Sequence, residues 1–178
     1  MKEKPRMSFI NRLLGTRPDP REELRPLWHR SVEISRQPHW YAQHGVADTV
    51  PGRFDMITAI LALVLLRLEQ DEGGVTDSTL MTELFVEDMD GQLRETGVGD
   101  VVVGKRMGRL VSVLGGRIGA FRTALAQPDN AALEDAVARN VTLNEGASPA
   151  GLAAALRLFQ GDLASLDYAA VRAGRIGE

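Results

Sequence analysis

Apolar residues recur at three- and four-residue steps along most of this chain. Such spacing is typical of amphipathic helices, and no segment shows the sustained alternation that marks a strand. We therefore predict an all-α protein, a single compact helical domain of about six to eight helices. The expected helices cover approximately residues 19–36, 52–71, 77–96, 100–127, 130–143 and 148–166, with an irregular stretch or a short helix at 39–50.

The most apolar segment is the run from Ile57 to Leu66, interrupted only by Thr58. Because this run is apolar on nearly all sides, its helix is expected at the centre of the domain. It is too short to span a bilayer, which needs about 20 residues. The remaining organisation is simple: a basic tail over residues 1–18, without a recognisable signal peptide, and one helical domain over residues 19–178.

Composition excludes some classes of protein. The chain has no cysteine, which rules out a disulfide framework and a cysteine-built zinc site. Its net charge of −3 gives no overall preference for nucleic acid, and DNA is not an expected partner. The charges lie in blocks, which indicate complementary neighbouring elements or partner binding. Residues 1–17 carry five bases and one acid, residues 71–100 nine acids and one base, and residues 101–122 five bases and no acid.

The string from Gly99 to Lys105 matches most of a phosphate-binding loop, G-x-x-x-x-G-K. A complete motif continues with Ser or Thr and lies between a strand and a helix. Here Arg106 follows, the preceding element is predicted to be a helix, and the charge of Asp100 would repel phosphate. Asp100 is better interpreted as the cap of the next helix. A nucleotide-dependent enzyme or switch using Gly99–Lys105 is therefore the weaker alternative function.

Four glycines, Gly104, Gly108, Gly115 and Gly119, lie close to one face of the predicted helix 100–127. Each costs about 1 kcal/mol relative to alanine inside a helix. We interpret them as a face pressed against another helix of the same chain, such as the helix at 52–71. The alternative is a groove that receives a helix of a partner.

Charged side chains supply the other candidate sites. Asp88 and Asp90 lack the spacing of a calcium loop, and Asp90 is predicted to pair with Arg94 one helical turn later. A basic cluster on the following helix is expected to be a solvated face or the partner of the acidic helix, with a patch for acidic protein or RNA as the alternative. Its members are Lys105, Arg106, Arg109 and Arg117.

No residue group has the spacing of a catalytic or metal site. The histidines His29, His39 and His44 do not occur at paired metal-ligand spacing, and nothing resembles a nucleophile elbow. We therefore predict no catalytic residue, no metal and no cofactor.

A long ordered set of motifs runs through residues 40–121. The set begins with Trp40-Tyr41, Gly45-Val46-Ala47-Asp48-Thr49, Gly52-Arg53-Phe54 and Arg67-Leu68. Its most specific part is Phe85, Asp88-Met89-Asp90, Leu93-Arg94-Glu95, Gly97-Val98-Gly99-Asp100 and Gly104-Lys105. In this order the motifs resemble the ubiquinol–cytochrome c chaperone family, the assembly factors of the cytochrome bc1 complex (respiratory complex III). Residues 1–20 and 130–178 carry little of the resemblance.

The resemblance implies a helical chaperone that is not an enzyme. Mitochondrial members of the family work with a small partner protein, contact the ribosome and receive newly made cytochrome b. The resemblance therefore implies early assembly of the bc1 complex, with cytochrome b or another bc1 subunit as partner. It places the protein in the cytoplasm of a bacterium, with peripheral contact at the inner membrane, or on the matrix side of a mitochondrion. An apolar face in the tail, formed by Phe9, Ile10, Leu13 and Leu14, is a candidate for membrane contact, although a self-packed or unstructured tail is the preferred interpretation.

The positions that match the family are the candidate partner-binding residues. Maintenance of the fold explains most of them equally well, and a structural domain without chaperone activity is a third hypothesis. The candidates are Trp40, Tyr41, Arg53, Asp88, Asp90, Arg94, Asp100 and Lys105.

Overall fold

The computed structural model describes the backbone of residues 19–95 and 100–177, and their side chains except those of residues 93–103, 105 and 106. Within these residues the only β-type pairing is an isolated bridge between Val46 and Leu143, so the prediction of an all-α fold is confirmed. The elements are η1 (Pro20–Leu24), α2 (Arg25–Ser35), α3 (Pro38–Ala42), α4 (Val50–Leu68), α5 (Gly74–Glu95), α6 (Asp100–Leu125), α7 (Ala131–Asn140), α8 (Pro149–Ser165) and α9 (Tyr168–Arg172).

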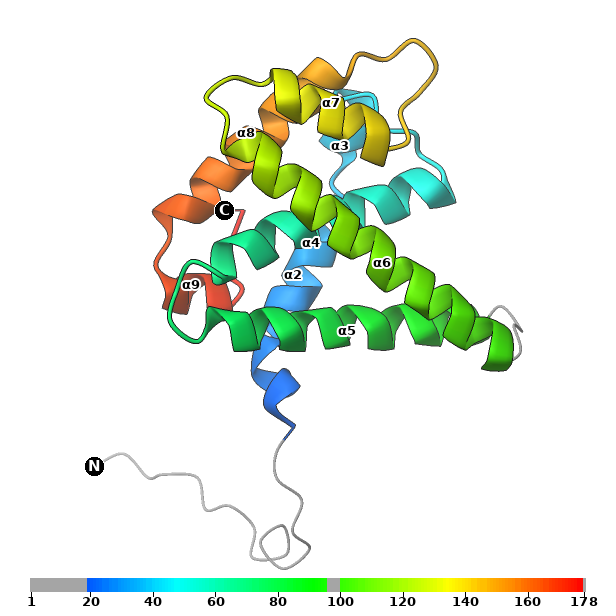
Figure 1. Ribbon diagram of the computed structural model, residues 1–178, viewed down its shortest axis with the longest axis vertical. Coiled ribbons are helices and arrows are strands. Elements are labelled where there is room, and N and C mark those ends of the chain that lie inside the picture. Colours follow the sequence, from blue (N-terminus) through cyan, green and yellow to red (C-terminus); the bar gives the residue numbers. More distant parts are fainter. Residues whose placement is uncertain (1–18, 96–99, 178) are drawn as a thin grey trace, which may run out of the picture.

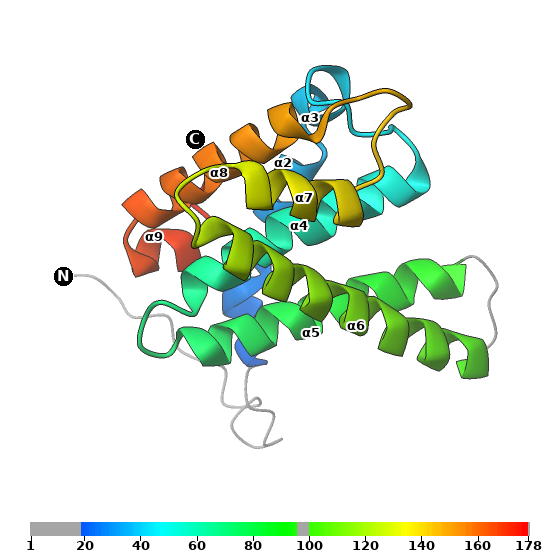
Figure 2. The same ribbon diagram turned by 45° about the horizontal axis from the view of Figure 1, so that its top comes forward.

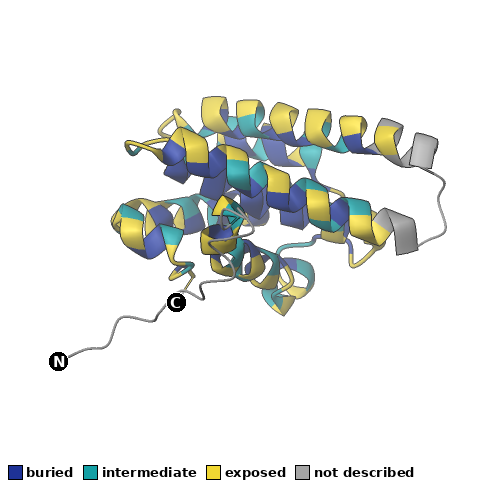
Figure 3. Cartoon of the chain, turned by 90° about the horizontal axis from the view of Figure 1, so that it is seen from below, coloured by how far each residue is buried: buried dark blue, intermediate teal, exposed yellow. Residues whose placement is uncertain are grey.

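Helix α4 forms the centre of a single compact domain, as its apolar sequence predicts (Figures 1 and 2). Every residue from Asp55 to Leu65 is buried. Helices α2, α5, α6 and α8 all pack against α4. Figure 3 shows buried positions along the faces that the helices turn toward one another and exposed positions on their outer faces. Burial on every side gives α4 its nearly uniform apolar sequence.

Side-chain caps fix several helix starts close to their predicted positions. The Asp19 carboxylate accepts a hydrogen bond from the backbone N–H of Arg21 at 2.9 Å, and the Ser148 hydroxyl accepts one from Ala150 at 3.2 Å. The Thr49 hydroxyl accepts one from Gly52 at 3.3 Å, so α4 begins two residues before its predicted start. These caps satisfy amide groups that the first turn of a helix leaves unpaired.

The predicted start of α5 is wrong. The helix was expected from residue 77, but it already begins at Gly74. Gly73 has a φ of +84°, and a Cβ on Gly74 would overlap the backbone carbonyl of Leu68. The glycine pair therefore makes a turn too tight for other residues and starts the helix early. Asp77 lies inside the helix as a buried side chain.

The interpretation of the α6 glycines as a close-packed face is also wrong. Gly104, Gly108, Gly115 and Gly119 are exposed, and a Cβ on any of them would meet nothing within 4 Å. The helix contacts the core through a different face, which includes the buried residues Met107, Leu114 and Phe121. The glycine face points to solvent.

Arg117, predicted to belong to a solvated basic face, is instead buried in the core. Its Nη2 donates to the Asp55 carboxylate at 2.5 Å, and its Nη1 donates to the Asp55 carbonyl and to the Thr58 hydroxyl. The second oxygen of Asp55 accepts hydrogen bonds from the amide and the hydroxyl of Thr142, at 2.9 and 2.7 Å. This ionic cluster joins α4, α6 and the segment that follows α7.

Candidate partner-binding surfaces

The two aromatic residues of α3 fasten this short helix to the end of α2. The Trp40 indole N–H donates to the carbonyl of Ile34 at 2.7 Å, and the Tyr41 hydroxyl donates to the carbonyl of Ser35 at 2.8 Å. Trp40 is only 3% exposed, and its hydrogen bond holds the corner between α2 and α3. Tyr41 is partly exposed, and burial raises the pKa of its hydroxyl.

Arg53 lies beside Tyr41 at the first turn of α4. Its guanidinium donates to the carboxylate of Asp48 at 2.6 Å, which lowers the pKa of Asp48 and raises that of Arg53. Both charged side chains are largely exposed. With Arg36 and Pro38 they line a hollow of about 530 Å³. The structure thus brings together Tyr41, Asp48 and Arg53 from three separate sequence motifs.

A second hollow, of about 630 Å³, continues this surface along α2 and shares Arg36 and Pro38 with the first. It reaches Asp88 on α5, and a third hollow, of about 240 Å³, extends from there to Glu87. We call the three together the α2 furrow. Its apolar and aromatic side chains are Trp28, Val32, Pro38, Tyr41, Ala42 and Leu84, and its charged ones are Arg25, Glu33, Arg36, Asp48, Arg53, Glu87 and Asp88.

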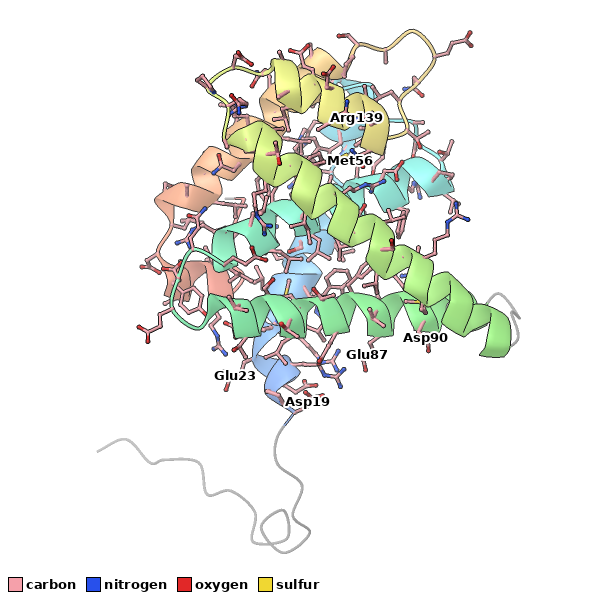
Figure 4. The ribbon with its side chains drawn as sticks, in the orientation of Figure 1. Asp19, Glu23, Met56, Glu87, Asp90 and Arg139 are labelled. Atoms are coloured by element: carbon pink, nitrogen blue, oxygen red, sulfur yellow. The ribbon has the colours of Figure 1, made fainter. Side chains whose placement is uncertain are left out.

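Asp90 faces a different surface from Asp88. Side chains two residues apart on a helix point in nearly opposite directions, which separates the two aspartates. Asp90 lines a hollow of about 690 Å³ between α5 and α6, which we call the α5–α6 groove. Figure 4 shows Asp90 and Glu87 on α5, toward the end that meets α6. The groove is lined by Arg21, Glu69, Ser78, Thr79, Thr82, Glu83, Val86, Glu87, Asp90, Val111 and Ile118.

The side chains of Arg94, Asp100 and Lys105 lie outside the described residues, so the predicted Asp90–Arg94 pair stays a prediction. The backbone is nevertheless informative. Residues 100–105 are the first turns of α6, and the element before them is the helix α5. A phosphate-binding loop requires a strand followed by a loop at this place. The described backbone therefore lacks the context that the nucleotide-binding alternative needs.

Within the described part of the chain, no group of three or more His, Asp or Glu residues is placed to hold a metal ion. His39 and His44 come together, with ring centres 5.7 Å apart, but they pack around Trp40. Burial and the neighbouring His44 lower the pKa of His39. None of the described helices combines the length and apolarity that a membrane crossing requires.

Sequence reasoning missed the buried charged residues that organise the fold. Arg67 is buried and donates to the carbonyls of Leu163 and Leu166, at 3.0 and 2.7 Å, at the end of α8. It also pairs with Asp71. Arg67 belongs to one of the motifs that carried the family resemblance. Its position at the end of an apolar helix was the sequence feature that could have indicated a buried charge. Asp55, just before the apolar run, offered a similar signal.

The sequence matches the family model described as ubiquinol-cytochrome C chaperone over residues 42–177. The chain belongs to this family. The match extends through α7, α8 and α9, so the expectation that residues 130–178 carry little of the resemblance is wrong. Trp40 and Tyr41 lie just before the matched range.

A solved structure supports the same assignment to the ubiquinol-cytochrome C chaperone family. The crystal structure of the Cbp3 homolog from Brucella abortus is 32% identical in sequence and superposes with a TM-score of 0.75. The similarity covers 87% of this chain and 87% of that one. No curated protein matches the sequence.

Proposed function

We propose that this protein is a non-enzymatic assembly chaperone of the cytochrome bc1 complex and that it assists newly made cytochrome b. The observation that carries the proposal is the family match over residues 42–177, which spans nearly the whole helical domain. The similarity to the Cbp3 homolog over most of both chains supports it. A small assembly partner and the ribosome are further proposed partners, and the proposed location is the cytoplasmic or matrix side of the membrane that holds the complex.

The α2 furrow is the surface that we propose for partner contact. It combines an apolar floor with an exposed charged rim, which is the anatomy of a protein-binding surface. Tyr41, Arg53 and Asp88 would contact the partner, whereas Trp40 would hold α3 in place. Asp90 would act at the α5–α6 groove. Arg94, Asp100 and Lys105 remain proposed contacts at the end of the α5–α6 pair.

The test is recovery of bc1 subunits from cells that contain the complex, after mild solubilisation of their membranes. We expect the wild-type protein to recover cytochrome b and the double variant Arg53→Glu/Asp88→Lys to recover several-fold less. Both side chains are at least partly exposed, so the fold should survive the changes. The matched control is Leu158→Lys on α8, a side chain that is 71% exposed and lies outside the furrow.

Two outcomes would contradict this proposal at different levels. Failure of the wild-type protein to recover any bc1 subunit, or to restore the complex in a strain lacking the gene, would reject the assembly function. Equal recovery by the furrow variant and the wild type would retain the function but reject the furrow as the contact surface.

A further inference from the structure

The end of the α2 furrow beside α3 has one positive charge without a counter-ion, that of Arg36. This residue directly follows α2, and its side chain is exposed. Among the residues that the structure describes, none forms an ion pair or a side-chain hydrogen bond with the Arg36 guanidinium. The other base at this end, Arg53, is already paired with Asp48 at 2.6 Å. The positive charge that is free to meet a partner here is therefore that of Arg36.

The end of the furrow beside α5 has a negative charge without a counter-ion, that of Asp88. Its partner among the described residues is Gln92, a neutral side chain whose Nε2 donates to the carboxylate at 3.2 Å. The second carboxylate at this end, Glu87, already lies 3.4 Å from Arg25 and 3.6 Å from Arg21. The negative charge that is free to meet a partner here is therefore that of Asp88.

These two charges lie at opposite ends of one hollow. Both Arg36 and Asp88 line the hollow of about 630 Å³. Arg36 also lines the hollow beside α3, which Asp88 does not line, and Asp88 also lines the hollow that extends to Glu87, which Arg36 does not line. The remaining charged residue of the shared hollow, Glu33, pairs with Arg30 at 2.9 Å. The furrow therefore has a direction, positive toward α3 and negative toward α5.

Apolar side chains separate the two charges. Trp28, Val32 and Pro38 line the shared hollow, and Trp28 and Val32 are one helical turn apart on the same face of α2. Trp28 lies at the level of Asp88, because both also line the hollow at the α5 end. At a rise of 1.5 Å per residue, the distance along α2 from Trp28 to Arg36 is about 12 Å.

This spacing fits a helix of a partner protein that lies along α2. Such a helix covers the same length in two turns, so side chains about seven or eight residues apart on one face reach both ends of the hollow. The apolar surface between the ends suits the apolar face of an amphipathic helix, as in other helix-in-groove complexes. Complementary charges at the two ends fix the orientation of the helix and disfavour partners with the wrong charges.

We propose that the α2 furrow binds an amphipathic helix of its partner in one orientation. The helix places an acid against Arg36 and a base against Asp88, about seven or eight residues apart, with apolar side chains between them on the same face. A helix with like charges at the two positions binds more weakly. This inference rests on the proposed function, which supplies the partner, and adds the chemistry of the segment that is bound.

Exchanging the two charged residues tests the direction of the furrow. The variant Arg36→Asp/Asp88→Arg keeps the composition and the net charge of the chain. The control variant Asp135→Arg/Arg139→Asp makes the same exchange between two exposed residues of α7 that line none of the three hollows. Each full-length protein is used to recover bc1 subunits from mildly solubilised membranes. We expect the furrow exchange to lower recovery at least about fivefold, because like charges then meet at both ends, and the control exchange to leave it unchanged.

The single variants Arg36→Asp and Asp88→Arg separate partner contact from a contact within the chain. Each should lower recovery, and combining them should not restore it. Restoration by the combined exchange would overturn the proposal, because it would show that the two residues act on each other. If circular dichroism shows that the exchange lowers the helix content, Arg36→Gln/Asp88→Asn replaces it, and undiminished recovery by that variant would also overturn the proposal. Failure of the wild-type protein to recover any bc1 subunit would instead reject the proposed function itself.

A conservative variant tests the spacing. Arg36→Lys keeps the positive charge and supplies an amine that a carbodiimide links to a carboxylate in contact with it. We expect the linked peptide of the recovered subunit, identified by mass spectrometry, to carry a base about seven or eight residues from the linked acid. A linked acid without a base at that distance would overturn the proposed arrangement.

Discussion

At the scale of single residues, the pair of Asp55 and Arg117 places two charged side chains inside the core. Arg117 is 5% exposed and Asp55 is 8% exposed. Removing two charges from water is costly unless nearly every donor and acceptor is satisfied. The carboxylate meets this demand through Arg117 and Thr142, and only the Nε atom of Arg117 lacks a partner among the buried side-chain atoms described.

Breaking this buried pair should lower the free energy of unfolding far more than breaking an exposed pair. We expect Asp55→Ala to lower the free energy of unfolding by about 3–5 kcal/mol, because Arg117 would stay buried without a counter-ion. Asp48→Ala removes an exposed pair and should cost at most about 1 kcal/mol. Urea denaturation measures both.

The double variant Asp55→Ala/Arg117→Met provides the control for charge. Replacing both partners by apolar groups should recover a large part of the loss caused by Asp55→Ala alone. A double variant less stable than the single one would show that a buried Arg117 without its counter-ion is not the main cause of the loss in Asp55→Ala.

Tyr168 should titrate abnormally. Burial and its hydrogen bond to the Asp77 carboxylate, 2.6 Å long, raise its pKa from 10.0 to about 12. Because the folded-state pKa is the higher one, this contribution to stability is fully present below pH 10 and is lost as the pH rises toward 12. Ultraviolet titration of tyrosinate in a Tyr41→Phe variant isolates this group. A midpoint near 10 in the folded protein would contradict the Asp77 contact.

At the scale of elements, the glycines divide into two kinds that sequence alone does not distinguish. Gly52 is needed for a close approach, since a Cβ there would overlap the carbonyl of Ala47. Gly119, on the exposed face of α6, has nothing within 4 Å of the Cβ position. A glycine is therefore sterically required in α4 at Gly52, whereas α6 has room for a side chain at Gly119.

Alanine substitutions should show this difference. We expect Gly119→Ala to raise the free energy of unfolding by about 0.5–1 kcal/mol, because alanine favours the helix and its methyl group is unobstructed. Gly52→Ala should destabilise the protein, since the backbone of Ala47 cannot give way easily. Thermal melts followed by circular dichroism measure both changes. Destabilisation by Gly119→Ala would restore the idea of a close-packed α6.

The helices themselves were predictable because their signals are local. Ser148-Pro149 and Asp19-Pro20 each carry a cap and a proline within two residues, and the structure starts helices there. The beginning of α5 was not predictable, since it depends on the contact of Gly74 with Leu68 across the turn. The side of α6 that faces the core depends on how α6 crosses α4, which no local pattern contains.

At the scale of the whole molecule, the candidate residues were predictable but their grouping was not. The family motifs identified Tyr41, Arg53 and Asp88, which lie on three different helices. Only the tertiary arrangement joins these three residues into one furrow, whereas the helical period alone already separates Asp90 from Asp88. The pairing of Asp55 with Arg117 was likewise not predictable, because the two residues are 62 positions apart in the sequence.

The fold is closed by contacts between its first and last elements. Arg172 of α9 pairs with Glu23 of η1 at 2.8 Å and with Asp77 of α5 at 2.7 Å. Arg30 of α2 donates to the carbonyls of Ile176 and Gly177 at 3.0 and 2.7 Å. The residues after α9 therefore lie against α2 and belong to the same core, although they form no regular element.

This closure predicts that a change after α9 weakens the whole domain. Ile176 is 0% exposed, so Ile176→Ala should lower the free energy of unfolding by about 2–5 kcal/mol through the cavity it leaves. The neighbouring exposed Arg175→Ala should change it by less than about 0.5 kcal/mol. Fluorescence of Trp28 and Trp40, which lie on α2 and α3, and helical circular dichroism should shift together to lower urea in the Ile176 variant. If the tryptophan transition stayed in place while only part of the helical signal was lost, the segment after α9 would be a separate unit rather than part of one cooperative core.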